Sequence, residues 1–469
     1  MPHTLESLLA AIAPTGPSRD ILNPATGELV GKVAEHSVDD LNNAIAAAKK
    51  AQKGWAALGH EKRSELMMKA ADAIAENGEA LAQLLTREQG KPLNGPNARF
   101  EIGGAEAWLR VAAGTPLESE VIKDDESGRS ELTYAPIGVV AAIGPWNWPA
   151  MITIWQVAPA LRMGNTVVVK PSEFTPLIVS ALIHIMNTVL PEGVVNVVSG
   201  GREVGAALTV DPAIGKVMFT GSTATGKAII KSSADTVKRL TLELGGNDAG
   251  IVLPDVDPAA IAEGLFWGAF LNTGQTCAAL KRLYVHESVA DEVTKALVSV
   301  AAAMPMGDGT DENNVLGPLQ NKKQYDIVAD LVEKAKAGGG KVELGGNPDA
   351  NQKGFFYPTT IVSGLSNDNA LVQVEQFGPA LPIVTYSNID EAIEMANAVD
   401  VGLGASVWSS DKTKAREVAE RLEAGTVWIN SHGGVHPMVP FGGNKQSGYG
   451  LEFGVEGLKA LGVPRVINS

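Results

Sequence analysis

Short apolar, β-branched runs alternate with helix-like stretches along this chain of 469 residues, and this alternation limits its fold more than any other feature. Residues 165–170 read Asn-Thr-Val-Val-Val-Lys, and comparable runs occur at 138–143, 194–199, 216–220 and 241–244. Stretches with helical character separate these runs. Strand, helix and strand repeated at this spacing predict parallel βαβ units and a doubly wound α/β sheet.

The pattern starts again after Gly250, which predicts a second α/β domain with its boundary near Gly245-Gly246. The chain is also longer than one compact domain usually is. Its expected elements are a strand at 251–253, a helix through 267, a strand at 283–285 and a helix through 303. In the first half, helices are expected at 38–57, 62–89, 150–162 and 175–189.

Charge and composition exclude several classes of partner. The net charge of −15 is spread along the chain without acidic or basic blocks, which argues against nucleic acid and anionic membranes. The first residues show no basic stretch leading into an apolar core, so no secretory signal is expected. One cysteine, Cys277, allows neither an internal disulfide nor a cysteine-rich metal site, and no metal is predicted. A free thiol favours a cytoplasmic location.

An uncharged segment at 132–161 is long enough to resemble a membrane span. However, Pro145-Trp146-Asn147-Trp148-Pro149 lies in its middle, and two prolines around a tryptophan pair would break a spanning helix. The segment is better interpreted as a buried strand, a tight functional loop and a buried helix.

Cys277 is the strongest candidate for chemistry. It follows Thr273-Gly274-Gln275-Thr276, and these residues predict an open loop instead of a packed strand. The alternative is a small buried hydrophobic residue, which is a common role for a lone cysteine. Glu243, in a second segment rich in glycine, offers a base. The pattern therefore favours a nucleophile at Cys277.

A glycine-containing loop at 219–227 is a candidate phosphate-binding site because it follows an apolar run and leads into a helix expected from residue 228. Gly221 to Lys227 also fits the start of a nucleotide-triphosphate P-loop, but Ala228 stands where that loop needs a hydroxyl for magnesium. The dinucleotide pattern is imperfect too, and a purely structural turn is the third interpretation.

Lys170-Pro171-Ser172-Glu173 leaves the end of an expected strand, where ligands of open α/β sheets bind. The lysine and the glutamate are both able to reach ribose hydroxyls. A carboxylate there would repel an added 2′-phosphate, which favours NAD over NADP. The alternative is an ordinary solvated loop.

Further motifs occur in the same order along the chain: Asn23-Pro24-Ala25-Thr26-Gly27-Glu28, Glu375-Gln376-Phe377-Gly378-Pro379 and Pro440-Phe441-Gly442-Gly443-Asn444-Lys445-Gln446-Ser447-Gly448. Together with those above, they resemble the NAD(P)-dependent aldehyde dehydrogenase superfamily. The resemblance implies two doubly wound Rossmann-type domains and a small β oligomerisation arm. The implied division is 1–116 with 136–245 for the NAD-binding domain, 246–445 for the catalytic domain, and 117–135 with 446–469 for the arm and tail.

The resemblance also implies catalytic roles. Cys277 would attack the aldehyde carbon, and the Asn147 side-chain amide with the Cys277 N–H would hold the oxyanion. Glu243 would activate the water that hydrolyses the thioester, and Glu452 matches a carboxylate that some relatives use to relay protons. Because Glu243 is present, release of a free acid is favoured over transfer of the acyl group to coenzyme A.

The cofactor and substrate residues also follow from the resemblance. The residues implied in cofactor binding are Trp146, Lys170, Ser172, Glu173, Gly221, Ser222, Gly245, Glu375 and Phe377. The residues implied in the substrate tunnel are Trp148, Met151, Trp155, Thr276, Ala278, Val435 and Phe441, with a loop at 432–438 that carries two histidines. No arginine occurs in these segments, so an uncharged aliphatic or aromatic aldehyde is expected before a charged semialdehyde.

The oligomerisation arm implied by the resemblance predicts that copies of this chain assemble. Residues 130–134 read as a strand, which is expected to pair with a partner subunit's C-terminal region in a homodimer or a homotetramer. The rival functions are a catalytically silent member of the fold and an NTPase. A silent member would be expected to lose Cys277, Asn147 or Glu243, and this chain has all three.

Overall fold

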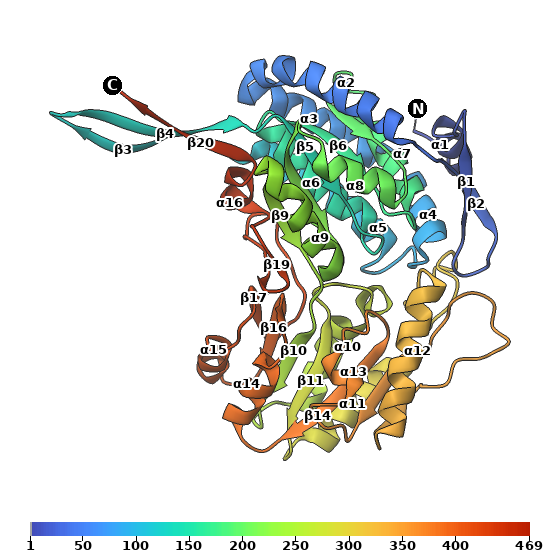
Figure 1. Cartoon of the computed structure of the whole chain (residues 1–469). Coiled ribbons are helices and arrows are strands. Elements are labelled where there is room, and N and C mark those ends of the chain that lie inside the picture. The colour runs from blue at the N-terminus through green and yellow to red at the C-terminus, as the bar shows by residue number, and fades with distance from the viewer. Residues whose placement is uncertain (1) are drawn as a thin grey trace.

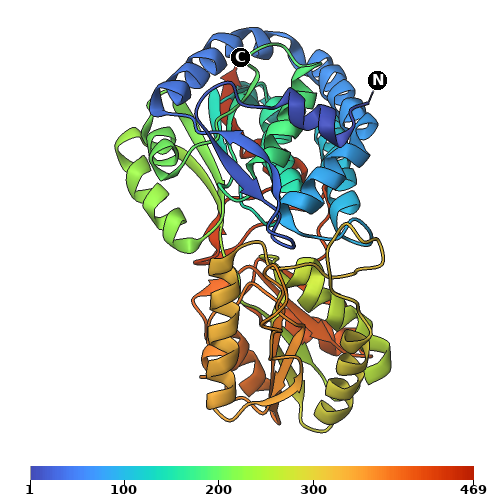
Figure 2. The same cartoon turned by 90° about the vertical axis from the view of Figure 1, so that its right-hand side faces the viewer.

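The structure, a computed structural model, describes residues 2–469. Figure 1 shows two lobes, one coloured blue to green and the other yellow to orange, with a thin arm projecting from the first. Figure 2 shows the same lobes with helices on both sides of their sheets. The two main sheets contain six and seven strands, which confirms the expected doubly wound α/β architecture.

The first sheet has the order β19-β9-β8-β5-β6-β7. Its strands are β5 (Val139–Ile143), β6 (Thr166–Lys170), β7 (Val195–Val197), β8 (Ile214–Thr220), β9 (Arg239–Glu243) and β19 (Gly448–Tyr449). All pair in parallel except β19, which pairs antiparallel with β9. The five parallel strands confirm the five apolar runs expected from the sequence.

Helices bury both faces of this sheet, and β5 shows how the sequence arranges this. Val140 and Ala142 join a core with helices on one face, whereas Val139, Ala141 and Ile143 join a core on the other. The first core includes α3 (Gly59–Glu76), α4 (Gly78–Gln89), α5 (Ala98–Gly114), α6 (Pro149–Arg162) and α7 (Pro176–Asn187). The second includes α2 (Val38–Ala57), α8 (Arg202–Val210) and α9 (Thr223–Ser233). Because both faces are covered, every residue of β5 is apolar.

Two helix predictions were wrong in detail. Residues 62–89 were expected to form one helix, but the chain breaks between α3 and α4 at Asn77, which has non-helical backbone angles. The Asn77 side chain donates to Ala73 O and accepts from the His3 N–H, an example of the competition with helix hydrogen bonds that asparagine offers. Helix α9 begins at Thr223 and not at residue 228, because the Ser222 side chain caps it.

The second sheet has the order β12-β13-β14-β11-β10-β16-β17. Its strands are β10 (Asp248–Val252), β11 (Leu280–His286), β12 (Lys341–Leu344), β13 (Thr360–Ser363), β14 (Ala380–Tyr386), β16 (Gly404–Trp408) and β17 (Thr426–Ile429). Only the edge strand β12 pairs antiparallel. Its covering helices are α10 (Pro258–Phe270) and α11 (Ala290–Ala302) on one face, and α12 (Lys322–Ala337), α14 (Ile389–Asn397) and α15 (Lys412–Ala419) on the other.

The arm is a separate sheet of three strands in the order β20-β4-β3, and it lies outside both lobes (Figure 1). Its strands are β3 (Glu120–Asp125), β4 (Gly128–Pro136) and β20 (Gly462–Asn468). The expected strand at 130–134 is present within β4, but β4 pairs with the C-terminal strand of its own chain. The prediction of pairing with a partner's C-terminus was therefore wrong for this strand, because residues 462–468 reach β4 directly.

The segment at 132–161 does not form a membrane helix. It contains most of β4, then β5, a loop and α6, as its prolines predicted. Across the described residues, no helix combines the length and apolar character that a bilayer span requires.

Candidate active site

The candidate site lies at the carboxyl ends of strands in the first sheet, where ligands of doubly wound folds bind. The loops after β5, β8 and β9 line a cavity of about 380 Å³, and the second lobe closes it with Cys277, Gln324, Ile327, Glu375 and Phe377. The residues contributed by the first lobe are Gly144, Pro145, Trp146, Asn147, Ser172, Phe219, Thr220, Gly221, Ser222, Glu243, Leu244 and Gly245. One cavity thus brings together ten of the residues expected from the sequence.

Cys277 follows a strained turn that lifts it toward this cavity. Asn272 and Thr273 have left-handed backbone conformations, with φ of 53° and 58°. At Gly274 a Cβ would come within 2.3 Å of the Gly378 carbonyl oxygen, so only glycine fits there. Side-chain bonds hold the strain in place, including Thr273 Oγ1 to Gly317 O at 3.0 Å. Strain stored beside a reactive group is typical of functional loops.

The environment of the thiol disfavours its ionisation. Burial, together with the carboxylates of Asp248, Glu243 and Glu375, raises the pKa of Cys277 to about 12. The ammonium group of Lys281 acts in the opposite direction. The environment of the thiol thus favours its protonated form.

Asn147 is fixed from several sides. It is 2% exposed, and its side-chain amide donates to Gln275 O at 3.0 Å, next to the Cys277 loop. Its own carbonyl accepts bonds from Asn272 Nδ2 and Lys91 Nζ, both at 2.9 Å. The amide therefore has a defined position beside the loop of the candidate nucleophile.

A buried ion pair supports the Asn147 loop. Lys91 Nζ lies 2.5 Å from Glu101 Oε2, and both side chains are fully buried. Glu101 Oε1 accepts from the Ala150 and Met151 N–H groups at 2.9 and 3.2 Å, so it also binds the first turn of α6. The Lys91 ammonium lies 3.5 Å from the Trp148 ring centroid. Burial lowers the pKa of Lys91 to about 8.

Glu243, which lines the cavity, forms a second buried pair with Glu452. They are 4% and 3% exposed, and neither oxygen of Glu243 has a hydrogen-bond partner among residues 2–469. Burial, together with the neighbouring Glu452, raises the pKa of Glu243 well above its usual range. Burial raises the pKa of Glu452 to about 7, against the effect of Lys216. Two carboxyl groups held this way are suited to exchanging protons near neutral pH.

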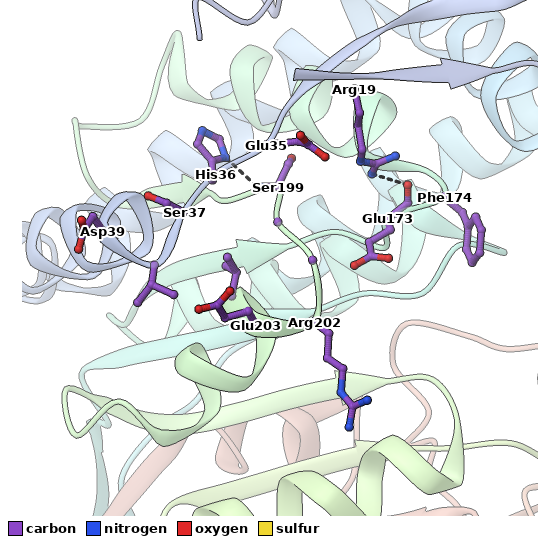
Figure 3. Close-up of a pocket in the computed structure, with 14 residues that line it drawn as sticks. Arg19, Glu35, His36, Ser37, Asp39, Glu173, Phe174, Ser199, Arg202 and Glu203 are labelled. Atoms are coloured by element: carbon purple, nitrogen blue, oxygen red, sulfur yellow. Dashed lines mark hydrogen bonds between the residues drawn. The ribbon is translucent and has the colours of Figure 1, made fainter. Parts of the chain in front are cut away.

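The residues expected to hold the adenosine ribose lie beyond the cavity. Glu173 lines a separate pocket of about 750 Å³. Figure 3 shows Arg19, from β1 (Ser18–Leu22), above Glu173, and Arg202 directed away from it. A Cβ at Gly201 would come 3.2 Å from Glu173 Oε1, and a Cβ at Gly205 would come 3.2 Å from Lys170 Cε. The N-terminal end of α8 thus lies close to Glu173 and Lys170, through Gly201 just before the helix and Gly205 within it.

The glycine loop after β8 is a helix N-terminus and not a P-loop. Ser222 caps α9 by accepting from the Thr225 N–H, so the loop is too short to wrap a triphosphate. Lys227, the residue that would reach a phosphate in a P-loop, donates to Gln446 Oε1 at 2.7 Å. The arrangement disfavours the NTPase interpretation and is compatible with a diphosphate at the helix end.

Glu375, Phe377 and Trp146 lie on the cavity wall near the thiol. The rings of Trp146 and Phe377 meet edge to face with centroids 5.3 Å apart, and Phe377 has a φ of 47°. A Cβ at Gly245 would come 2.4 Å from Glu375 Oε2, so this glycine leaves the space for the carboxylate. Glu375, Phe377 and Trp146 therefore line the same cavity as the thiol.

The expected tunnel residues divide between two apolar clusters. One contains Trp148, Met151 and Ile152, with Trp155 and Leu271 against it. The other contains Ala278, Phe441 and Phe453, with Trp155, Cys277 and Val435 against it. Thr276 accepts a hydrogen bond from Trp148 Nε1 at 3.0 Å. Trp155 therefore joins the two clusters beside the thiol.

One tunnel expectation was wrong. His432, at the start of the predicted tunnel loop, is a fully buried side chain whose Nε2 lies 3.5 Å from Asp248 Oδ2. Its Nδ1 lies 2.9 Å from Ser406 Oγ. The His432 side chain thus lies against Asp248 and Ser406 of the second sheet and does not line an open tunnel. The loop places His432 beside Gly268.

Sequence reasoning missed four residues that surround these groups: Lys91, Glu101, Lys281 and Phe453. Lys91 and Glu101 lie far from Asn147 in the sequence, so no local pattern connects them. Phe453 contacts Trp155 with ring centroids 4.7 Å apart, and it follows the Glu452 that was identified. Lys281 had a signal, since a lysine occupies the second position of an otherwise apolar strand.

Comparison with known proteins agrees with this geometry. The model of the aldehyde dehydrogenase family matches residues 12–466. Aldehyde dehydrogenase LUC3 of a Fusarium species is 40% identical over 93% of this chain and 92% of its own length. Phenylacetaldehyde dehydrogenase of Pseudomonas fluorescens is 38% identical over 94% of this chain and 90% of its own length.

Among solved structures, PnpE of Pseudomonas sp. WBC-3 in complex with nicotinamide adenine dinucleotide has a TM-score of 0.94. It is 38% identical, and the match covers 97% of this chain and 95% of PnpE. The family match over nearly the whole length, these relatives and the shared fold lead to one conclusion: the chain belongs to the aldehyde dehydrogenase family.

Proposed function

We propose that the protein oxidises an aldehyde to the carboxylic acid with NAD as the electron acceptor. The observation that carries this proposal is that Cys277, Asn147 and Glu243 line one cavity with seven of the nine expected cofactor residues. A nucleophile, an oxyanion donor and a base in a single water-limited cavity are the requirements of acyl chemistry through a covalent intermediate.

In the first step, the Cys277 thiol releases its proton to solvent and its sulfur bonds to the aldehyde carbon. The electron pair of the carbonyl π bond moves to oxygen, which gives a thiohemiacetal. The developing oxyanion lies between the Asn147 amide and the Cys277 N–H, and one such donor contributes roughly 3–4 kcal/mol. The contacts of Asn147 with Gln275 and Lys91 support this role, because they place the amide before substrate arrives.

The bound nicotinamide supplies the acceptor for the hydride, and a thioester on Cys277 results. Glu243 then takes a proton from the water that attacks the thioester, and the acid leaves. The raised pKa of Glu243 and its proximity to Glu452 support a role in which Glu452 passes the proton onward. Transfer to coenzyme A is the alternative outcome for the thioester.

The residues present fit a dinucleotide. Glycines at 201, 205 and 245 leave backbone space beside Glu173, Lys170 and Glu375, where any Cβ would come within 3.2 Å of a side-chain atom. Lys170 and Glu173 would bind the adenosine ribose, with Ser172 at the cavity edge. The N–H groups after Gly221 and Ser222 would bind the diphosphate. Glu173 favours NAD over NADP by repulsion of a 2′-phosphate.

For the substrate we propose an uncharged aliphatic or aromatic aldehyde. The two clusters around Trp155 offer apolar and aromatic side chains. The segments expected to line the tunnel, residues 148–155, 271–278 and 432–441, contain no arginine. A dicarboxylic semialdehyde would need such a group to bind its second carboxylate. The relative from Pseudomonas fluorescens is named for phenylacetaldehyde, which is an uncharged aromatic aldehyde.

We further propose that the arm mediates assembly into a homodimer or a homotetramer. Val121, Ile122, Val466 and Ile467 are 45–59% exposed on this narrow sheet. Exposed apolar strands of this kind are typical of interfaces between subunits. We also propose the domain division inferred from the sequence, and a cytoplasmic location.

The experiment is to follow reduction of NAD and of NADP separately with purified protein, across aliphatic, aromatic and semialdehyde substrates. We expect turnover with NAD and neutral aldehydes that disappears in Cys277→Ser. A strong preference for succinate semialdehyde would contradict the substrate class. Cofactor binding without turnover by any aldehyde, with or without coenzyme A, would identify a silent member. Magnesium-dependent phosphate release from a nucleotide is expected to be absent.

A further inference from the structure

Lys281 is a buried lysine beside the candidate nucleophile, and the steps proposed above do not use it. It is the second residue of β11 and lies four positions after Cys277. Its side chain is 2% exposed. The turn that ends in the bond from the Ala279 N–H to Thr276 O folds the chain back, so the ammonium group lies beneath the Cys277 loop.

Three acceptors surround the Lys281 ammonium group. Its Nζ donates to the carbonyl oxygens of Thr276 and Cys277 at 2.8 and 2.6 Å. It also lies 3.3 Å from Glu375 Oε1. An ammonium group has three N–H donors, so these contacts use all of them.

The bond to Thr276 has a direct consequence for the oxyanion. The Thr276 carbonyl and the Cys277 N–H belong to one planar trans peptide unit, so they point in opposite directions. Fixing the carbonyl therefore fixes the direction of the N–H, and a cation at the oxygen polarises the N–H as a donor. Lys281 thus fixes the orientation of the Cys277 N–H, the proposed oxyanion donor, through the Thr276 carbonyl of the same peptide unit.

The contact with Glu375 connects the same ammonium group to the proposed nicotinamide end of the cofactor site. Glu375 Oε1 accepts a hydrogen bond from the Gly246 N–H at 3.3 Å and lies 3.3 Å from Lys281 Nζ. Burial raises the pKa of Glu375, and Lys281 counteracts that effect. Lys281 and the Gly246 N–H therefore both hold the Glu375 carboxylate in place.

We propose that Lys281 is a positioning residue that fixes the Cys277 N–H and the Glu375 carboxylate relative to each other, so that thiol reactivity and cofactor binding depend on one ammonium group. This inference rests on the proposed function for the roles of Cys277 and Glu375. Charge supports the geometry, because Lys281 is the group that opposes burial and the carboxylates in setting the pKa of the thiol.

The test exploits the fact that Cys277 is the only cysteine, so alkylation by iodoacetamide reports on it alone. Alkylation rates are measured from pH 6 to 10, with NAD affinity from quenching of tryptophan fluorescence. In Lys281→Met we expect alkylation at pH 8 to slow by at least about tenfold, with the pH profile displaced upward. NAD affinity should fall about tenfold as well.

Two further substitutions separate charge from hydrogen bonding and guard against misfolding of Lys281→Met. Lys281→Gln keeps a donor for the carbonyls but loses the charge, so its pH profile should shift as well. Lys281→Arg should restore both the profile and NAD affinity most of the way. Lys336→Met is the matched control, because Lys336 also donates to a carbonyl, Gly346 O at 2.6 Å, and pairs with Glu333 far from the cavity.

Alkylation profiles and NAD affinities of Lys281→Met and Lys281→Gln within twofold of the unsubstituted protein would overturn the proposal. An equal effect of Lys336→Met would also overturn it, since the change would then be unspecific. Neither measurement requires turnover. Failure of the unsubstituted protein to oxidise aldehydes would therefore reject the proposed function, whereas unchanged Lys281 variants would reject only the role of Lys281.

Discussion

Two buried pairs of ionisable side chains, Lys91–Glu101 and Glu243–Glu452, differ in how their polar atoms are satisfied. In the Lys91–Glu101 pair, Lys91 Nζ contacts Glu101 and Asn147 O, and Glu101 Oε1 accepts two backbone N–H groups. In the Glu243–Glu452 pair, by contrast, three of the four carboxyl oxygens have no hydrogen-bond partner within residues 2–469.

This difference in hydrogen bonding indicates different roles for the two pairs. A buried ion pair with all its partners is rigid, and its charges are neutralised in every state of the protein. Two buried carboxyl groups with raised pKa values change protonation readily, and they keep lone pairs free for a proton. We infer that Lys91–Glu101 maintains the geometry of Asn147, whereas Glu243–Glu452 takes part in proton transfer.

The largest expected effect comes from removing one charge of the satisfied pair. Lys91→Met leaves Glu101 buried and unpaired, which should lower the free energy of unfolding by about 3–5 kcal/mol. Denaturant titration measures this loss. The double variant Lys91→Met/Glu101→Gln should lose less, because the glutamine side chain carries no charge and keeps an oxygen for the first turn of α6.

The control is Lys322→Met, which removes an exposed pair with Asp326 at 2.5 Å. It should change stability by about 1 kcal/mol or less. A Lys91→Met variant as stable as this control would show that the buried pair does not hold the loop.

A smaller effect is expected from Glu452→Gln, and it depends on pH. Folded Glu452 keeps its proton up to a pKa of about 7, whereas the unfolded carboxyl loses it near 4.5. Between these values the folded state binds more protons, so Glu452 lowers stability as pH rises, by about 3 kcal/mol at most, with no further loss above pH 7. Unfolding titrations at pH 5 and pH 8 should show a smaller difference in Glu452→Gln. Exposed Glu420→Gln is the control, and an equal pH dependence in both variants would contradict the burial argument.

The smallest expected effect comes from Trp148, whose ring packs on Lys91 of the Lys91–Glu101 pair. Trp148→Phe keeps an aromatic ring over Lys91 but loses the hydrogen bond to Thr276 Oγ1. We expect a loss of about 1 kcal/mol in unfolding free energy. Thr276→Val should cost a similar amount, and the double variant should not add the two costs. Full additivity would mean that the two side chains do not interact.

The sequence was sufficient to predict the order of elements, because both sheets are covered by helices and their strands are continuous apolar runs. Ten of the residues implied by the sequence motifs and by the family resemblance line the cavity. Strand ends alone point only to the loops after β6 and β8, because ligands of open α/β sheets bind there. The break at Asn77 was less predictable, because the flanking residues are good helix formers and the asparagine competes only through its side chain.

What the sequence could not reveal were contacts between distant positions. The sequence analysis assigned no role to Lys91 and Glu101, and only the tertiary fold buries them beside Asn147. The pairing of β4 with β20 joins strands from opposite ends of the chain, so no local pattern specifies whether the partner strand comes from the same chain. His432 likewise reads as a loop residue, although Asp248 binds it from another strand.

The most direct test of the account is a rapid-mixing measurement of NADH formation by Glu243→Gln with a neutral aromatic aldehyde. If Glu243 serves in hydrolysis, each active site should form about one NADH in a fast burst, and the following steady rate should fall by about 100-fold or more. A steady rate equal to that of the unsubstituted protein would contradict the central claim, because the unpartnered carboxylate would then have no part in the reaction.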